Sequence, residues 1–404
     1  MPYLPGMRRR EFLIGGTALG SAMLAGAPAL AQTVTLPFAN GTRPVAAYPQ
    51  KRPLIVMTTR PVQLETPMSI FNEGAFTPND AFFVRWHLAG VPTDIDVNAF
   101  RISVHGLVST PLQLSVADLK SSYDAVEVAA VCECSGNSRG FFNPRVPGGQ
   151  WGNGAMGNAL WKGVRLRDIL TKAGIGAGAV QVRFNGADQP VLPATPDFMK
   201  SLDMDLAMSD NVILAYSMNG ADLPVLNGYP VRLIVPGYFA TYWVKMLNDI
   251  EVLSEPDQNF WMKTAYRIPA DPCGCQQPGT TVKTIPINRL TVRSFITSVT
   301  DGARVRAGAL TVSGIAFDSG YGIQSVLFSS DGGAHWTPAT LGKDYGKYAF
   351  RPWQARFTSQ AGKQYTLASL AMNTIGEAQR LDNPVWNPGG YLRNTVETVR
   401  VSAS

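Results

Sequence analysis

The sequence predicts an α+β domain followed by an immunoglobulin-like β-sandwich, because of the chain's length, its composition and a change of pattern near Thr281. A chain of 404 residues exceeds what one ordinary hydrophobic core holds, so two domains are expected. Hydrophobic residues make up 45% and charged residues 16% of the chain, the composition of a well-packed globular protein. Strand and helix patterns are mixed before residue 281, whereas short alternating strands between Gly, Asp and Asn turns follow it.

The first 31 residues have the three parts of an export signal. Arg8-Arg9-Arg10-Glu11-Phe12-Leu13 begins it, a short apolar run continues to Ala27, and Ala29-Leu30-Ala31 provides a small-residue cleavage site. The apolar run is too short and too rich in glycine to cross a membrane. Paired arginines followed by Phe-Leu favour a twin-arginine signal, with an ordinary secretory signal as the alternative. We therefore expect a periplasmic protein that is exported already folded.

Residues 32–75 are rich in proline and are predicted to form an irregular N-terminal arm on the surface. Phe82–Gly90 then alternates like a strand, with Phe83, Arg85 and His87 on one face. An arginine and a histidine on the same face of an apolar strand either pair with buried carboxylates or point at an anion.

The net charge of +6 is spread out beyond the N-terminus, which argues against a nucleic-acid partner.

Two cysteines follow a short apolar run. Val128–Val131 predicts a buried strand, and it ends in Cys132 and Cys134 before a Ser-Gly-Asn turn. Arg139 lies five residues beyond the second thiol. A thiolate is a soft, charged ligand that needs a metal or a nearby cation when it is away from solvent. The alternative is that both thiols pack as small hydrophobic side chains.

The remaining elements are predicted from periodicity. A strand, a turn, a second strand and a short helix are expected over Phe100–Leu119. Farther along the first domain, helices are expected over Val164–Ala173 and Met199–Ser209, and strands over Val180–Phe184 and Val212–Gly220. The strands expected in the sandwich are Leu290–Ile296, Val305–Phe317, Ile323–Ser329, Tyr365–Asn373 and a last one that ends at Val401. His335 follows an Asp-Gly-Gly turn and is predicted to be a surface residue. Cys273 and Cys275 lie in a turn-rich tract between the two domains, and the sequence leaves their pairing and that of Cys132 open.

Two motifs in sequence suggest a family. Cys134-Ser-Gly-Asn-Ser-Arg139 is followed by Trp151-Gly-Asn-Gly-Ala-Met-Gly-Asn158-Ala-Leu-Trp161-Lys-Gly163. Their order and spacing resemble the molybdenum-cofactor segment of the sulfite oxidase family, and Phe-x-Arg-x-His at residues 83–87 extends the likeness. The resemblance implies a molybdopterin-binding, sulfite-oxidase-like domain over residues 76–280 and a dimerisation-type sandwich over residues 281–404.

The resemblance also implies roles for individual residues. Arg85, Arg139 and Tyr266 are implied to meet the substrate, and Cys134 to ligate molybdenum. The cofactor-binding residues that it implies are Phe83, His87, Cys134, Asp188, Asn227, Arg232, Trp243, Val244 and Lys245. Two positions depart from the family pattern. Asn227 stands where histidine is frequent, and Pro147 stands where the animal enzymes have lysine, which leaves open whether Arg145 joins the substrate pocket.

The implied activity is that of a sulfite dehydrogenase, which oxidises sulfite to sulfate by oxygen-atom transfer at a Cys-ligated molybdenum-pterin. No C-x-x-C-H haem motif is present, so electrons are expected to leave singly to an external c-type cytochrome. A homodimer is also expected. Three alternatives stay open: a molybdopterin-dependent sulfoxide reductase, a thiol hydrolase with Cys134 beside His87, and an adhesive sandwich on an inert carrier.

Overall fold

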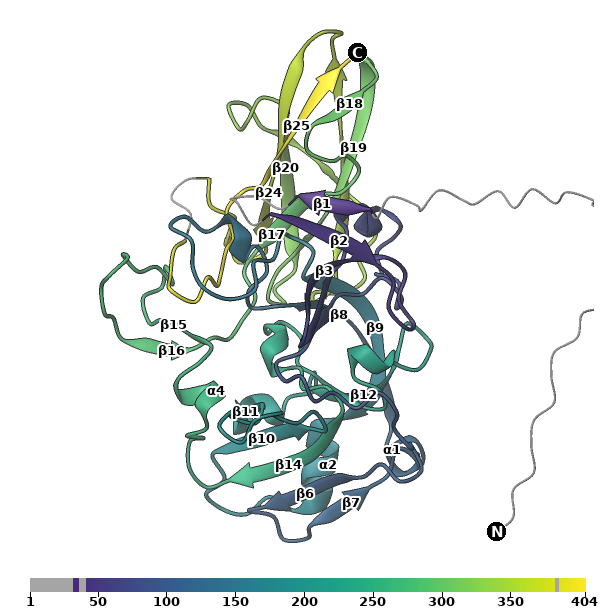
Figure 1. Cartoon of the computed structure of the whole chain (residues 1–404), viewed down its shortest axis with the longest axis vertical. Coiled ribbons are helices and arrows are strands. Elements are labelled where there is room, and N and C mark those ends of the chain that lie inside the picture. The colour runs from purple at the N-terminus through teal and green to yellow at the C-terminus, as the bar shows by residue number, and fades with distance from the viewer. Residues whose placement is uncertain (1–31, 36–40, 382–384) are drawn as a thin grey trace, which may run out of the picture. The chain divides into compact units, whose positions relative to one another are not determined.

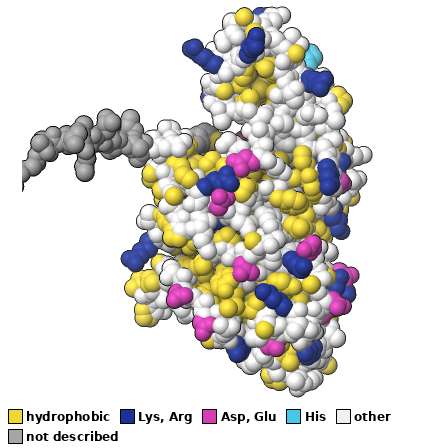
Figure 2. All heavy atoms as spheres, turned by 90° about the vertical axis from the view of Figure 1, so that its right-hand side faces the viewer, with side chains coloured by type: hydrophobic (Ala, Val, Ile, Leu, Met, Phe, Trp, Pro, Cys, Tyr) yellow, Lys and Arg dark blue, Asp and Glu magenta, His cyan; other side chains and the backbone are white. Residues whose placement is uncertain are grey.

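The computed structural model describes residues 32–35, 41–381 and 385–404, and Figure 1 shows its course. The predicted export signal over residues 1–31 lies outside the described residues, and Gln32–Ser404 forms one compact unit. Within the described part, none of the helices has the length and apolar character of a membrane span. On the face shown in Figure 2, Lys and Arg side chains are interspersed with acidic and apolar ones rather than gathered into one basic patch.

The segment after residue 31 contains a five-stranded sheet, so the prediction of an irregular arm over residues 32–75 is wrong. Its strands, in spatial order, are β1 (Thr33–Thr35), β2 (Thr42–Ala46), β3 (Leu54–Thr59), β4 (Val62–Glu65) and β5 (Val84–Arg85), with a 3₁₀ turn, η1, at Met68–Asn72. Pro53, Pro61 and Pro67 fall between these elements, where a missing N–H does no harm. Because Gln63 pairs with Arg85, this sheet fixes the strand that carries the arginine.

Two further sheets, the central sheets, come between this first sheet and the C-terminal sandwich in the sequence. One has the order β11 (Met199–Asp203), β10 (Gln181–Gly186), β14 (Leu247–Leu253), β6 (Ile102–Gly106) and β7 (Leu112–Leu114). The other has the order β13 (Arg232–Ile234), β12 (Ile213–Met218), β9 (Met156–Arg165) and β8 (Ala125–Glu133). Short helical segments connect them: α1 (Val116–Ser122), η2 (Arg139–Phe141), α2 (Leu166–Ala173), α3 (Met204–Ala207), η3 (Val225–Asn227), η4 (Ala240–Tyr242) and α4 (Phe260–Lys263).

Local sequence explains where most of these elements begin and end. Ser115 and Asp118 form a reciprocal capping box at the start of α1, and Gly174, with φ of 70°, ends α2 in the left-handed conformation. The helix predicted over Met199–Ser209 is wrong in its first half, which is β11 instead. There, antiparallel pairing with β10 buries Lys200 and outweighs the local helical pattern.

The C-terminal part is the predicted β-sandwich. One of its two sheets has the order β17 (Arg293–Ile296), β19 (Gly308–Phe317), β23 (Arg351–Ser359) and β22 (Thr340–Leu341). The other has the order β18 (Ala303–Val305), β25 (Thr398–Ala403), β24 (Gln364–Asn373), β20 (Ile323–Ser329) and β21 (Thr337–Pro338). Val312, Phe328 and Trp353 are among the side chains packed between them. A two-stranded ribbon, β15 (Arg267–Pro269) with β16 (Thr284–Pro286), precedes the sandwich, and His335 is exposed as predicted.

One end of the sandwich shares its core with the central sheets. Phe295, Ile315, Phe317 and Phe350 belong to the same buried cluster as the side chains of β8, β9 and β12. The ring of Phe350 also meets Phe71 of η1 edge-on, at 5.9 Å between centroids. The predicted boundary at residues 280/281 stays a prediction, but the residues on either side of it are packed together.

Candidate active site

One cavity collects eight of the twelve side chains predicted to hold cofactor or meet substrate. It encloses about 440 Å³ not filled by atoms. The predicted residues in its lining are Phe83, Arg85, His87, Cys134, Asn227, Arg232, Lys245 and Tyr266. Ser135, Phe198, Leu226, Ala240 and Thr241 complete it and were not among the predicted site residues.

Strand β5 and the residue pair beyond it supply the aromatic side of the cavity. The imidazole of His87 stacks on Phe198, with 3.5 Å between ring centroids, and its Nε2 is hydrogen-bonded to the hydroxyl of Tyr266. Burial, helped by Arg85 and other cations, lowers the pKa of His87 well below its usual value, so the ring is neutral. Burial also raises the pKa of Tyr266, which keeps the phenol protonated.

This hydrogen bond leaves one donor for a ligand whichever group donates. If the Tyr266 hydroxyl donates to Nε2, the proton of the neutral ring is on Nδ1, which has no partner among the described residues. If Nε2 donates, the phenolic O–H is unused. Tyr266 has φ of 54°, a left-handed conformation that is strained for a tyrosine and is frequent at functional sites.

The cysteine loop leaves β8 in a network of short-range hydrogen bonds. The Asn137 backbone N–H donates to the Cys134 carbonyl at 2.9 Å, and the Asn137 side-chain oxygen accepts the N–H of Ala155 at 3.0 Å. Cys134 thereby faces the cavity, and its thiol is free. Cys132 is also free, but it is fully buried outside the cavity lining, 3.3 Å from the guanidinium of Arg232. Burial raises the pKa of Cys132.

A buried arginine of the sandwich contacts both ends of the cysteine loop, at Glu133 and Ser138. Arg293 of β17 contacts Glu133 at 3.2 Å, and both side chains are at most 2% exposed. The same guanidinium donates to the Ser138 hydroxyl at 2.9 Å. Ser138 has φ of 67°, so the arginine ties down a strained residue of the loop. Neither Arg293 nor Glu133 was predicted, since no local motif joins residues 160 positions apart.

Arg139 does not line the cavity. Its Nε donates to the carbonyl of Gly389 at 3.0 Å and its Nη1 to that of Gly149 at 3.1 Å. The guanidinium lies 5.3 Å from the ring centroid of Tyr391, which in turn stacks on Tyr266 at 5.7 Å. Of the three residues implied to meet the substrate, Arg85 and Tyr266 therefore line the cavity, whereas Arg139 does not.

The opposite end of the cavity is cationic. Arg232 donates to the backbone carbonyl of Asn227 at 3.2 Å, and the Lys245 ammonium lies 4.3 Å from the centroid of Trp86. Burial, reinforced by Arg232, lowers the pKa of Lys245 to about 7. Of the predicted cofactor residues outside the lining, Asp188 is buried, with a pKa raised by burial to about 6.

Trp243 and Val244 are buried in the core beside this end. The indole N–H of Trp243 donates to the Tyr238 carbonyl at 3.0 Å, and its ring meets Trp161 edge-on at 5.7 Å. The backbone N–H of Leu233 donates to the Val244 carbonyl at 2.8 Å, which joins this segment to β13. These two residues thus support Arg232 and Lys245 rather than line the cavity.

Lys51 positions Asn227. No motif in the sequence predicted this role, because Lys51 lies in the proline-rich segment over residues 32–75. Its ammonium donates to the side-chain oxygen of Asn227 and to the carbonyl of Phe82, and it is only 6% exposed. Burial lowers the pKa of Lys51 to about 7. The amide nitrogen of Asn227 donates to the Phe83 carbonyl at 2.9 Å. Asn227 is thus held at both ends of its amide.

We expect Lys51→Met to lower the free energy of unfolding by about 1–3 kcal/mol, because buried acceptors lose their donor. It should also lower the affinity for the cofactor, since Asn227 loses one anchor. Thermal unfolding and the molybdenum content of the purified variant measure the two effects. Lys120→Met, on the exposed part of α1, is the matched control, and equal losses in both variants would contradict the assignment.

The residues present fit an anionic cofactor with a soft metal. Buried polar atoms without a partner among the described residues gather in this lining: Arg85 Nη1, His87 Nδ1, Ser135 Oγ, Arg232 Nε and Thr241 Oγ1. Such atoms are ordinarily paired in native proteins, so their concentration marks a ligand site. The lining holds two arginines and a lysine but no carboxylate, and its one thiol is the ligand type that a soft metal prefers.

Comparison with known proteins agrees with this geometry. Residues 87–261 match the model of the oxidoreductase molybdopterin binding domain. The chain is 33% identical over 365 residues to sulfite oxidase from Gallus gallus, covering 86% of this chain and 78% of that protein. It is 32% identical over 390 residues to mitochondrial sulfite oxidase from Homo sapiens, covering 91% and 69%.

The fold is also that of a solved relative. The sulfane dehydrogenase SoxCD from Paracoccus pantotrophus matches with a TM-score of 0.74 at 24% identity, over 95% of this chain and 93% of that one. The match shows that the two chains share a fold over almost their whole length. The chain is a member of the sulfite oxidase family, and it is a molybdopterin-dependent oxidoreductase.

Proposed function

We propose that this protein is a periplasmic sulfite dehydrogenase that passes electrons one at a time to a c-type cytochrome. The observation that carries the proposal is the joining of Cys134, Arg85 and Tyr266 in one cationic cavity of a sulfite oxidase family member. The relatives with the printed name sulfite oxidase support sulfite as the substrate. The twin-arginine pattern at Arg8-Arg9-Arg10 supports export.

The cavity residues divide into a metal side and a pterin side. Cys134 would ligate molybdenum, while Arg232, Lys245, Thr241 and Asn227 would hold the anionic pterin part. When bound, the cofactor supplies oxygen-atom transfer and accepts two electrons. The protein supplies placement and charge, and every remaining step concerns its own side chains.

Arg85 would bind and orient the substrate. Sulfite is a small dianion at neutral to basic pH, and a guanidinium offers it a fixed pair of donors that stay charged. Nη1 of Arg85 is buried and unpaired among the described residues, so this donor is available to a ligand in the cavity. The imidazole of His87 and the phenol of Tyr266 are both neutral. The N–H or O–H that their mutual hydrogen bond leaves unused would therefore act as a neutral hydrogen-bond donor to an oxygen of substrate or product.

The test is direct. Purified holoprotein given sulfite is expected to reduce ferricytochrome c, with two haems reduced for each sulfate formed, as followed by absorbance and ion chromatography. Turnover with artificial dyes alone would reject the cytochrome while leaving sulfite oxidation in place. Turnover of a sulfane-sulfur compound without any turnover of sulfite would reject the substrate.

Arg85→Gln should raise the sulfite KM by about 10- to 100-fold, because a charge-assisted pair at the anion is lost (about 1.5–3 kcal/mol). Steady-state kinetics across a range of ionic strengths measure the change. Arg400→Gln, which removes an exposed guanidinium paired with Asp301, is the matched control and should leave KM unaltered. An Arg85 variant that changes only kcat would contradict the binding role.

The hydrolase alternative has less support from the geometry. A cysteine nucleophile needs a base within hydrogen-bonding reach. The Nε2 atom of His87 is instead occupied by Tyr266, and no hydrogen bond joins the His87 ring to Cys134 among the described residues. Molybdenum analysis of folded protein distinguishes the two functions.

A further inference from the structure

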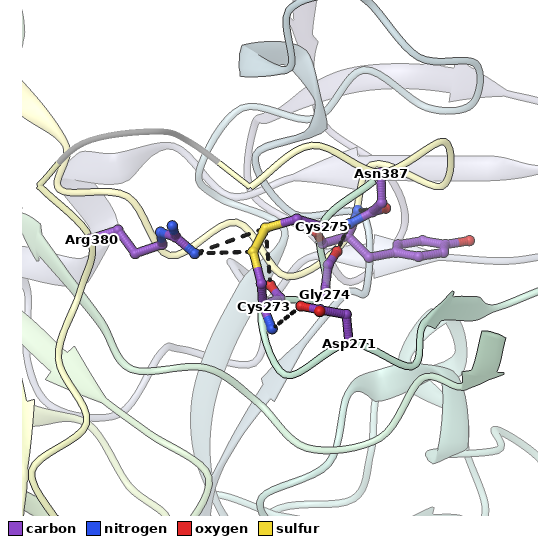
Figure 3. The surroundings of a disulfide bond; sticks show 7 residues. Asp271, Cys273, Gly274, Cys275, Arg380 and Asn387 are labelled. Carbon is purple, nitrogen blue, oxygen red and sulfur yellow. Dashed lines mark hydrogen bonds between the residues drawn. A yellow bond between two sulfur atoms is a disulfide. The ribbon is translucent and has the colours of Figure 1, made fainter. Parts of the chain in front are cut away.

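The two cysteines outside the active site form a disulfide that the proposed function does not use. Cys273 and Cys275 are bonded to each other, two positions apart in sequence (Figure 3). Both side chains are partly exposed, and Cys273 lines a surface hollow together with Pro272, Glu377, Arg380 and Leu392. A crosslink over so short a loop removes little freedom from the unfolded chain, so a stabilising role explains it poorly.

The turn that carries the two sulfurs is held without the disulfide. The N–H of Cys273 donates to the Asp271 carboxylate at 2.7 Å, and Gly274 adopts φ of 62°. The side chain of Asn387 donates to the Gly274 carbonyl at 3.2 Å, and the Gln276 N–H donates to the Trp386 carbonyl at 2.8 Å. Reduction would therefore leave two thiols facing each other, ready to re-form the bond.

A guanidinium is aimed at the sulfur pair. Nη1 of Arg380 lies 3.3 Å from Cys273 Sγ and 3.9 Å from Cys275 Sγ, as Figure 3 shows. A cation at this distance stabilises a thiolate. The negative charges of Asp271 and of Glu377, which lines the same hollow, disfavour a thiolate here. The Asp271 carboxylate, however, already accepts a hydrogen bond from the Cys273 N–H.

We propose that Cys273–Cys275 is a thiol–disulfide exchange site for a small organic thiol, with Arg380 as its activating cation. A thiolate attacks Cys273 Sγ from the hollow, the bond to Cys275 breaks, and Cys275 leaves as a thiolate beside Arg380. A second thiolate attacks the sulfur that the first thiol contributed to this mixed disulfide, and Cys273 is released as a thiolate. Overall, two thiols lose two electrons and form a disulfide, and the protein gains those electrons and two protons.

Glutathione redox buffers test the exchange on the folded holoprotein. After acid quenching and alkylation, peptide mass spectrometry is expected to show Cys273 and Cys275 becoming labelled together as the buffer becomes more reducing, while the labelling of the free thiols Cys132 and Cys134 is the same in every buffer. Arg380→Met should shift the equilibrium toward the disulfide by about threefold, the size expected for a partly exposed charge pair. Arg380→Lys should recover part of the shift, and Arg400→Met should cause none.

Single-cysteine variants test which sulfur is attacked. With oxidised glutathione, Cys275→Ser should form a mixed disulfide at Cys273 faster than Cys273→Ser forms one at Cys275, because Cys273 borders the hollow. The proposal is overturned if no thiols appear before the protein unfolds. It is also overturned if Arg380→Met leaves both rate and equilibrium unchanged, or if the order of the two adducts is reversed.

Discussion

Cys134→Ser is expected to abolish turnover while leaving the fold intact. The side chain faces the cavity and is the one thiol in its lining, so no described neighbour can replace it as a soft ligand. Mutating even an outer-shell partner of a metal ligand typically costs about 10–100-fold, and loss of the ligand itself should exceed that. Circular dichroism, molybdenum content and sulfite turnover together measure the outcome.

Cys132→Ser is the matched control, because it removes a thiol two residues away that lies outside the cavity lining. The control should retain bound molybdenum. If Cys134→Ser turned over sulfite at the rate of the unmodified protein, the assignment of the metal side of the cavity would be wrong.

Arg293→Gln should have the largest effect on stability. It leaves Glu133 buried without its cation, and breaking a fully buried ion pair in this way costs about 3–5 kcal/mol. Burial already raises the pKa of Glu133, and Arg293, followed by the hydrogen bond from Asn137, opposes this rise. The same change removes one of the hydrogen bonds that hold the strained Ser138, so the cysteine loop should also loosen. Chemical denaturation measures the first effect, and the alkylation rate of Cys134 in cofactor-free protein measures the second.

Arg400→Gln again serves as the control, since its ion pair with Asp301 is exposed and worth about 1 kcal/mol or less. The double variant Glu133→Gln/Arg293→Gln should recover part of the lost stability, because no uncompensated charge remains. Equal destabilisation by Arg293→Gln and Arg400→Gln would show that the buried pair does not hold the loop.

Much of the fold could be predicted because it follows local patterns. Ile323–Ser329 was predicted with the bounds that the structure has, and α2 ends at Ala173 as predicted. The predictions for residues 32–75 and Met199–Ser209 were wrong where pairing with the neighbouring strand along the chain, rather than local composition, decides the conformation. Proline content in particular cannot separate an irregular arm from short strands with prolines between them.

The site was predicted as far as motifs reach. The strand predicted over Phe82–Gly90 is confined to Val84–Arg85, yet Arg85 and His87 both reach the cavity, and Cys134 directly follows β8. Arg139 belongs to a recognisable motif, yet the direction of its side chain depends on the carbonyl of Gly389, 250 residues later in the chain, as well as on that of Gly149. Phe198, Lys51 and Arg293 reach the site or its supports only through tertiary packing, which no single stretch of sequence encodes.

The aromatic side chains shared by the sandwich and the central sheets limit how this protein can be cut or recombined. Phe350 and Phe317 of the sandwich pack in one core with Phe71, which precedes the catalytic sheets. A fragment that ends in the linker would expose these phenyl rings to water, and a foreign sandwich would have to supply matching ones. The C-terminal sandwich is therefore not an interchangeable module, and recombination between relatives should succeed only when the incoming sandwich carries aromatic side chains that match this core.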